Sequence, residues 1–422
     1  FMDSIVHTLP APNRPATVLH NDEEITLEPD PDGPTVLQVF KTVDDQYGSV
    51  SYFRVLSGTA QSDTRLYNVN TRTEERLGQL FLPRGKEQLP VDKVVAGDIG
   101  AVVKLSSTVT GHTLCKKGDD YQAIPPVYPE PLYAVAVHPK TQSDTGKLGP
   151  VTQRLTAADP TLNARTETKT RQFLLEGMGE THINVTVKRM ADKYGLNIET
   201  SIPKVPYQET ITKVASARYR HKKQTGGAGQ FAEVELRVEP LERGSEFEFA
   251  SEVFGGAISS TFFPSIEKGI KQVMAQGILA GSPIVDLKAV VVDGKEHPVD
   301  SKDIAFQIAG REVFKQAFMN AGPVLLEPVM EVRVTVPEEF TGDVMSDLTT
   351  KRAQVQGMEQ DKGDTVITAL APLAEIQRYG TDLRSITQGR GIYEQKLSHY
   401  QVVPSHLAQE IIEAYKREQE QD

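Results

Sequence analysis

One order of predicted strands and helices occurs twice in this chain, and no other sequence feature constrains the fold as strongly. From Leu132 to Thr200 the patterns predict a strand, a helix from near Thr141 to before Asp159-Pro160, two strands, a helix over Glu180–Tyr194 and a strand. The same order returns from Met330 to Tyr400. This βαββαβ order is typical of ferredoxin-like domains, so we expect two of them.

The segment between the two copies predicts a separate middle domain. Three strands precede a helix over PSIEKGIKQVMAQ, and a further strand precedes a second long helix. Pro264 stands at the start of the earlier helix and Gly277 follows its end, as these residue types commonly do. Asp300 or Ser301 is expected to cap the later helix.

Short β-type runs dominate from Thr35 to Leu114. Stretches such as SVSYFRVLSG and GAVVKL alternate with turn signals such as AGDIG, which indicates an all-β barrel or sandwich. Residues 1–9 instead place Phe1, Ile5, Val6 and Leu9 on one helical face. A helix so short is marginal alone, so it is either the last helix of a preceding domain or a frayed terminus.

The expected organisation has seven parts. These are a helix of a preceding domain at 1–15, an acidic linker at 16–34, a β-barrel at 35–122, a ferredoxin-like domain at 123–203, a middle domain at 204–328, a second ferredoxin-like domain at 329–403 and a C-terminal helix at 404–422. The fold class is therefore multidomain α+β.

The composition allows several packed cores. The chain has 422 residues, of which 38% are hydrophobic, and single cores stop growing near roughly 250–300 residues. No run of about 18 apolar residues predicts a membrane span. Cys115 is the only cysteine, which excludes an intrachain disulfide and a cysteine-based zinc site and fits a reducing compartment. Its expected role is that of a small apolar residue in a strand.

The charge distribution permits a local basic surface. The net charge is −11, yet seven acidic residues and a single arginine lie between Asp3 and Asp32. Because so much of the negative charge is concentrated there, an acidic total does not exclude RNA binding elsewhere in the chain.

No motif predicts nucleotide, metal or catalytic chemistry. A P-loop needs G-x-x-x-x-G-K-[ST], and the sequence has none. The turn Gly226–Gly229 leads into a strand pattern and not into a helix whose N-terminus could bind phosphate. Asp45–Gly48 matches D-x-x-G, for which a hairpin turn is the better interpretation. His182 follows two glycines in an expected strand-to-helix turn, so we predict no catalytic residue and no metal site.

The stretch RYRHKKQTGGAGQF, from Arg218 to Phe231, is the strongest functional candidate. Strand alternation is expected to place Arg218, Arg220, Lys222 and Lys223 on one face, followed by a glycine-rich turn. This is either a solvated hairpin tip or an RNA-binding finger. In the second case the cations neutralise phosphates, and the glycines let the backbone approach a groove.

Several stretches together resemble translation elongation factor G, the ribosomal translocase, or its elongation-factor-G-like paralogues. They cover nearly the whole chain in the family's order: FMDSIVHTLPAPNRP (end of the GTPase domain); YGSVSYFRVLSGT and VVAGDIGAVVKL (second domain); AADPTLNARTE and EGMGETH (third); HKKQTGGAGQF, GGAISSTFFPSIEKGI, HPVDSKDIAF and GPVLLEPVMEV (fourth); GDVMSDLTTKR and YGTDLRSITQGRG (fifth). The resemblance implies a translation-factor β-barrel, two ferredoxin-like domains and, between them, a domain with a ribosomal-protein-like βαβ fold.

The resemblance also implies functional residues. The fourth domain would be a lever that enters the decoding site, with tip loops at Gln224–Gln230 and Gly294–Ser301 that meet the codon–anticodon helix. The fifth would lie on large-subunit RNA. The implied RNA- or ribosome-binding residues are Arg218, Arg220, Lys222, Lys223, Gln224, Gly226, Gly227, Gly229, Gln230, His297, Asp300, Ser301, Arg384, Thr387, Gly389 and Arg390.

The implied partners are both ribosomal subunits and the tRNA–mRNA complex, for a cytoplasmic monomer without membrane contact. GTP and Mg²⁺ would belong only to a full-length parent, because the P-loop that holds them is absent from this sequence. We therefore expect no cofactor in this chain, and a sequence cut just inside the boundary of a GTPase domain.

Some positions depart from the family pattern. Ala228 stands where a basic or polar residue is common, Ala232 stands where glycine is common, and GGAISSTFFP lacks a usual proline and charges. These departures favour a paralogue that acts in ribosome recycling or ribosomal protection. An RNA- or ribosome-binding adaptor without a nucleotide is an alternative of another class.

Overall fold

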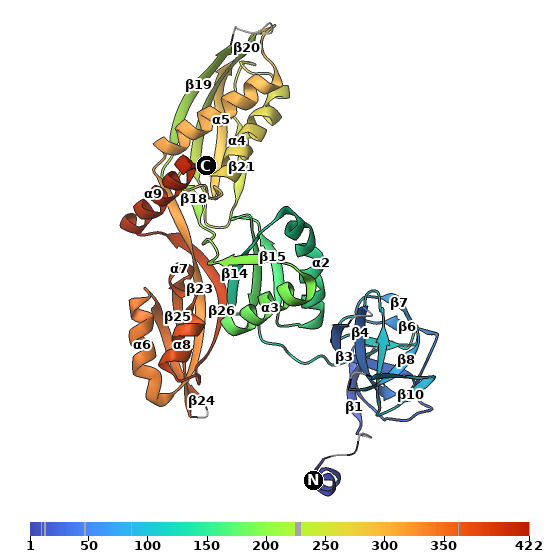
Figure 1. Ribbon diagram of the computed structural model, residues 1–422. Helices are drawn as coiled ribbons and strands as arrows, with labels where there is room; N and C mark the ends of the chain where they lie inside the picture. Colours follow the sequence, from blue (N-terminus) through green and yellow to red (C-terminus); the bar gives the residue numbers. More distant parts are fainter. Residues whose placement is uncertain are drawn as a thin grey trace. The chain divides into compact units, whose positions relative to one another are not determined.

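The computed structural model describes residues 1–9, 11, 14–45, 48–85, 87–223, 229–361 and 363–421. Figure 1 shows the elements in chain order, coloured along the sequence. The chain divides into two compact units, of which the first comprises residues 1–165 and 174–201 and the second residues 166–173 and 202–422. Within the described ranges, no helix is both long and apolar enough to cross a membrane.

The chain begins with helix α1 (Met2–Thr8), as the apolar spacing predicts. No residue of this helix is buried. Ile5 and Val6 within it, and the flanking Phe1 and Leu9, are all exposed. The described part of the first unit therefore leaves the apolar side chains of this segment uncovered.

The predicted linker at 16–34 is wrong in its first half. Strands β1 (Ala16–His20) and β2 (Glu23–Leu27) form an antiparallel hairpin, and β1 also pairs with β13 (Tyr121–Ala123). Asn21 and Asp22 between them have φ angles of 51° and 66°, which suit a two-residue hairpin turn. Val18 and Leu27 are buried in a small core. The exposed acidic residues concealed the apolar alternation of this hairpin.

Residues 36–115 form the predicted β-barrel around one core that includes Phe53, Leu77 and Leu80. The main sheet is antiparallel in the order β7-β6-β12-β3-β4-β11-β8-β9, and β5 (Thr59–Gln61) pairs with β10 (Lys93–Val95). Cys115 is buried, and this burial raises the pKa of its thiol, as befits a core residue. The strands of the main sheet are β3 (Val36–Asp45), β4 (Gly48–Ser57), β6 (Thr64–Asn68), β7 (Thr73–Leu77), β8 (Leu80–Arg84), β9 (Glu87–Val91), β11 (Ile99–Val103) and β12 (Thr113–Cys115).

The first predicted ferredoxin-like copy is confirmed. Its sheet has the order β15-β16-β14-β17, in which the first strand along the chain lies between the third and the fourth. The Thr141 hydroxyl accepts a hydrogen bond from the Asp144 N–H and so caps the first helix, as the sequence suggests. The elements are β14 (Tyr133–Pro139), α2 (Gln142–Ala158), β15 (Asn163–Glu167), β16 (Gln172–Gly177), α3 (Glu180–Tyr194) and β17 (Ile198–Ser201).

The second copy has the same strand order, and two details differ from prediction. β23 (Pro323–Pro337) runs without interruption across the predicted boundary at residues 328 and 329, and its first residues pair with β18 (Gln208–Ile211). Pro328 is tolerated because a β-bulge against β26 follows it. Where the sequence predicts a single helix after β25, the structure has two short helices. The remaining elements are η2 (Glu338–Phe340), α6 (Thr341–Thr350), β24 (Gln354–Asp361), β25 (Asp364–Pro372), α7 (Leu373–Ile376), α8 (Tyr379–Ile386) and β26 (Ile392–Val402).

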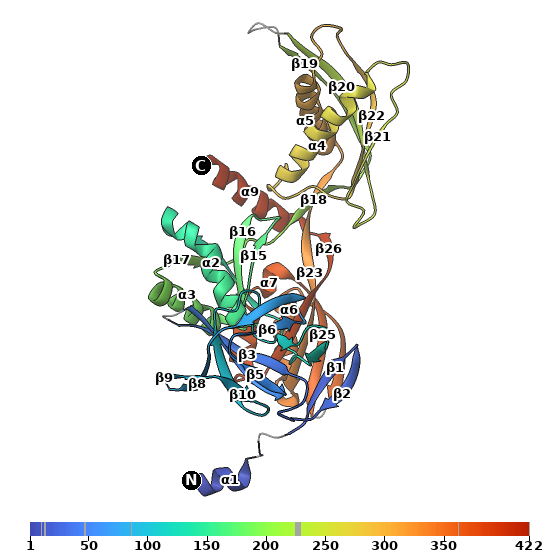
Figure 2. The ribbon, with the colours of Figure 1, turned by 90° about the vertical axis from the view of Figure 1, so that its right-hand side faces the viewer.

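The middle domain is one sheet with two helices on one face (Figure 2). The strand order is β19-β20-β22-β21, with only the β21–β22 pair parallel. The two helices pack closely because Gly269 lies against the Gln307 carbonyl and Gly310 against Ile266. The elements are β19 (Ala215–Lys223), β20 (Gln230–Pro240), β21 (Phe247–Ser251), η1 (Ser260–Phe262), α4 (Phe263–Gln276), β22 (Leu287–Lys295) and α5 (Asp303–Asn320).

The C-terminal helix α9 (Ser405–Gln421) lies within the part predicted for it at 404–422. Its Tyr415 ring lies so close to Gly281 that a Cβ on this glycine would be 2.5 Å from it. The Lys204 ammonium forms an ion pair of 2.6 Å with Glu418. The helix is thereby anchored to two other segments of the second unit.

Candidate RNA-binding surface

The hairpin β19–β20 carries the basic stretch to its end. The two strands pair continuously from Ala215–Val238 to Lys223–Gln230. Since side chains alternate along a strand, Arg218, Arg220 and Lys222 share the outer face of the sheet, which is opposite to the helices. Lys223 belongs to the other face, so the prediction of one common face for all four cations is wrong.

The two arginines already have carboxylate partners. The Arg218 guanidinium forms ion pairs with Glu233, Glu235 and Asp293, at 2.5 Å for Asp293 and 3.4 Å for the two glutamates. Arg220 pairs with Glu233, whose side chain is only 7% exposed. Glu233 and Glu235 lie opposite the arginines on β20, and Asp293 lies beside Glu235 on the next strand, β22, so the sheet itself neutralises both cations.

The two lysines at the end of the hairpin differ from the arginines in their ion pairing. Lys222 and Lys223 are exposed, and neither forms an ion pair with a described residue. Next to them, the His221 Nε2 lies 2.9 Å from the Gln230 amide oxygen. The predicted residues Gln224, Gly226 and Gly227, together with Ala228, lie outside the described residues. Of the first tip loop, Gln224–Gln230, the structure thus describes Gly229 and Gln230, and Lys222 and Lys223 end the strand that leads into it.

The second predicted tip loop is ordered by its own polar groups. The His297 Nδ1 accepts hydrogen bonds from the N–H groups of Val299 (3.3 Å) and Asp300 (3.2 Å). The Ser301 hydroxyl accepts from the His297 N–H at 2.8 Å. This arrangement leaves the imidazole half-exposed at the surface of the loop.

Asp300 and Ser301 do not cap the following helix, contrary to prediction. Helix α5 begins at Asp303, and its N-cap residue, Lys302, makes no capping side-chain bond. The hydroxyl of Ser301 instead donates to the Phe231 carbonyl at 2.8 Å. The carbonyl of Asp300 accepts from the Phe231 N–H at 3.0 Å. Both residues are therefore used to join the two tip loops.

Gly229 shows how closely the tip loops approach. A Cβ at this position would lie 2.3 Å from a carboxylate oxygen of Asp300. The Phe231 and His297 rings lie side by side, with centroids 6.1 Å apart. The structure therefore brings Gly229, Gln230, His297, Asp300 and Ser301 into one surface, as the sequence suggests.

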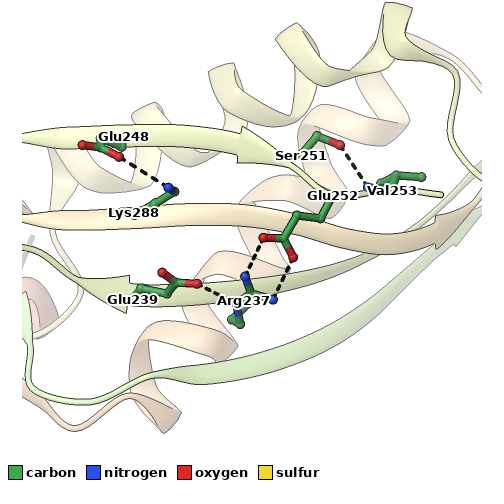
Figure 3. A network of polar contacts seen from close by, with 7 residues as sticks. All are labelled: Arg237, Glu239, Glu248, Ser251, Glu252, Val253 and Lys288. Carbon is green, nitrogen blue, oxygen red and sulfur yellow. Dashed lines mark hydrogen bonds and ion pairs between the residues drawn. The ribbon is translucent and has the colours of Figure 1, made fainter.

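A third loop, residues 252–259, joins this surface and was not predicted. Ile258 is buried against Gly294, and the Ser259 N–H donates to the Glu296 carboxylate at 2.9 Å. At the other end of the loop, Glu252 binds Arg237 through two hydrogen bonds of 2.8 and 3.0 Å (Figure 3). Its signal in the sequence is the pair Gly255-Gly256, whose φ angles are 69° and 71°.

The candidates in the fifth region do not form one exposed set. Thr387 is fully buried, so the predicted RNA contact of its side chain does not hold. Its hydroxyl donates to the Leu383 carbonyl and accepts from the Gly391 N–H. Gly389 has a φ of 82° in the turn after α8. Arg384 and Arg390 are exposed, and Arg390 forms an ion pair of 2.8 Å with Glu339.

Other candidate sites have structural roles. His182 lies at the turn from β16 to α3, where its Nε2 is 3.1 Å from an Asp159 carboxylate oxygen and its Nδ1 accepts from the Met178 N–H. Asp45 and Gly48 are paired where β3 meets β4, as a hairpin turn requires. Across the described ranges, no cluster of three or more His, Cys, Asp or Glu residues could hold a metal ion.

Known proteins match this chain along most of its length. Family models described as elongation factor G domain 2, domain III, domain IV and C-terminus match residues 34–117, 128–202, 203–322 and 324–411. An elongation factor G of Aquifex pyrophilus is 42% identical over 418 residues, which are 98% of this chain and 60% of that protein. A crystal structure of a Thermus thermophilus protein has a TM-score of 0.79 and 37% identity, and the match covers 99% of this chain and 60% of that one. The chain thus spans 60% of the length of both relatives.

Proposed function

Because this chain belongs to the elongation factor G family, we propose that it is the ribosome-binding body of a translocase that moves tRNA and mRNA. Residues 203–322 act as the lever, and their tip loops enter the decoding site. The sequence contains no P-loop. GTP and Mg²⁺ therefore bind elsewhere in the whole protein, and the energy of hydrolysis reaches this body through its contacts with that part.

The observation that carries this proposal is the joined tip of the lever. Phe231 is bonded through its N–H and its carbonyl to Asp300 and Ser301, so the second tip loop is fixed to the start of β20. Lys222 and Lys223 flank this joined tip and have no carboxylate partner among the described residues. A preorganised backbone with flanking cations is suited to the shape and phosphates of an RNA helix.

A specialised role in ribosome recycling or ribosomal protection is the second candidate. It is favoured by Ala232, which is fully buried under the tip where glycine is common in the family, and by the altered third loop. Under this role the lever still enters the ribosome. The tRNAs would then not advance by one codon.

The test uses the whole protein, including its GTPase domain, in single-turnover translocation on programmed ribosomes. We expect one codon of tRNA movement with GTP. The variant His297→Ala should translocate more slowly with unchanged multiple-turnover GTP hydrolysis, because the imidazole is exposed at the tip. Ribosome binding without tRNA movement would support the recycling or protection role, and absence of ribosome binding would refute both.

A further inference from the structure

The third tip loop presents one bare aromatic side chain. Phe254 is 96% exposed, the largest exposed fraction of any described phenylalanine. Gly255 and Gly256 follow it in left-handed conformations, which only glycine adopts readily. The ring is therefore carried on a sharp turn that points it into solvent and away from the domain core.

The loop is nevertheless held firmly at both ends. At the first end, the Glu252 N–H donates to the Val291 carbonyl at 2.8 Å, and the Glu252 carboxylate is bound by Arg237 (Figure 3). At the second, Ile258 is 3% exposed and packs against Gly294. An exposed ring on an anchored loop loses little conformational entropy when it binds a partner.

The charges around this loop indicate the kind of partner. Lys295 follows Gly294, against which the loop packs, and it is exposed and makes no ion pair with a described residue, while the neighbouring Glu296 carboxylate is used by the Ser259 N–H. Lys222 and Lys223 are exposed at the end of β19, on the opposite edge of the same sheet. Lysine is depleted in the core of protein–protein interfaces, whereas cations beside an aromatic platform are typical of RNA-binding surfaces. RNA fits this arrangement better than a protein does.

We propose that Phe254 stacks on an unpaired RNA base when the tip binds the ribosome. The inference rests on the proposed function, and it adds a base contact to the two tip loops. The partner base must be unpaired or at a helix end, because A-form pairing keeps base faces inside the stack. Lys295 binds an adjoining phosphate, and the ring adds affinity that does not depend on salt.

The first test replaces Phe254 by the photo-crosslinking residue p-benzoylphenylalanine in the 422-residue chain. Val214→p-benzoylphenylalanine is the control, since Val214 is also exposed but lies just before the first residue of β19, at the end of that strand away from the tip. After irradiation of ribosome complexes, we expect adducts at position 254 with ribosomal RNA or tRNA, and none at position 214. Adducts with ribosomal proteins only, or no adduct from a bound chain, would overturn the proposal.

The second test measures ribosome affinity against salt for Phe254→Ala and Phe254→Tyr. The alanine variant should bind about tenfold more weakly at every salt concentration, with an unchanged slope, because stacking releases no counterions. The tyrosine variant should bind like the parent. Equal affinity of all three proteins would refute the stacking contact and leave the proposed function intact. Failure of the parent chain to bind would instead refute both.

Discussion

The outer face of the lever sheet has two regions that both carry basic residues but differ in how those charges are paired. Toward the base and the middle, Arg218, Arg220 and Arg237 each contact one or more carboxylates. At the tip, Lys222 and Lys295 have no such partner among the described residues. Basic residues in a strand are therefore not equivalent as RNA ligands, because those with cross-strand acids already have their charge balanced.

The boundary between the two regions is Gly294, which lies between the paired Asp293 and the exposed Lys295. A Cβ there would lie 2.3 Å from the Glu233 carbonyl oxygen and from the Ile258 side chain. Gly294→Ala should therefore lower the free energy of unfolding by about 3 kcal/mol, because backbone cannot yield as a side chain can.

Hydrogen exchange of the peptides around each substituted glycine measures this effect without assuming that the whole chain unfolds in one step. Gly357→Ala is the matched control, since Gly357 also lies in a strand and has no atom within 4 Å of the new Cβ. Its effect should be below about 0.5 kcal/mol. Similar protection in both variants would show that the tip loops are not packed as described.

The second prediction removes the acid that keeps the middle region neutral. Glu233→Gln preserves the shape of the side chain but leaves Arg218 and Arg220 without their shared buried carboxylate. Since the arginines are at least half-exposed, we expect a loss of only about 1–2 kcal/mol. Arg218 keeps Asp293 and Glu235, but the Arg220 guanidinium loses its carboxylate, so ribosome binding should also become more sensitive to salt.

Glu235→Gln is the control for this experiment. Glu235 is more exposed, and Arg218 keeps Asp293 when it is removed. Exchange protection and the salt slope should therefore both stay close to those of the parent. If Glu233→Gln left the slope unchanged while it lowered protection, the arginines would be structural only, and the RNA-binding surface would be confined to the tip.

The third prediction concerns the unpaired lysines. Replacement of Lys222 and Lys223 by alanine should weaken ribosome binding by about tenfold near physiological salt and lower the salt slope by roughly one to two, because about two phosphate contacts are lost. Arg220→Ala in the middle region should change the slope much less. An equal change in both variants would remove the distinction between the two regions.

Sequence alone predicted the domain plan because it depends on local periodicity. The twice-repeated βαββαβ order, the start of α2 at Thr141 and the Gly277 stop are all local signals. The β1–β2 hairpin was missed because its turn, Asn21-Asp22, has no glycine and acids dominate its composition. At the tip, the basic residues were visible, but their cross-strand acids were not, since pairing register follows from tertiary structure.

Two site residues illustrate the same limit. Ser301 resembles a helix cap in sequence, yet its hydroxyl binds a carbonyl on β20, seventy residues earlier. In sequence, Thr387 resembles a surface residue of a glycine-rich turn. In the structure its hydroxyl donates to the Leu383 carbonyl and accepts from the Gly391 N–H, which stabilises that turn. In both cases the local sequence does not determine which backbone groups the hydroxyl binds.

The last and smallest expected effect concerns the stability of the region around Arg237 and Glu252 at acidic pH. The hydrogen bonds from Arg237 lower the pKa of Glu252 below its ordinary 4.5, against the opposing effect of burial. A carboxylate with a lowered folded-state pKa stabilises the fold above its unfolded pKa, and this contribution is lost as the pH falls through the lowered value.

Arg237→Gln should therefore reduce exchange protection of β20–β22 at about pH 6, and the difference from the parent should close below about pH 4.5. Glu239→Gln leaves both Arg237–Glu252 bonds in place and should keep the acid dependence of the parent. In Arg237→Gln the loop that carries Phe254 keeps its other anchors, the Glu252 N–H bond to the Val291 carbonyl and the buried Ile258, so ribosome binding should stay close to that of the parent in both variants. A changed salt slope in Arg237→Gln would show that Arg237 belongs to the RNA-binding surface.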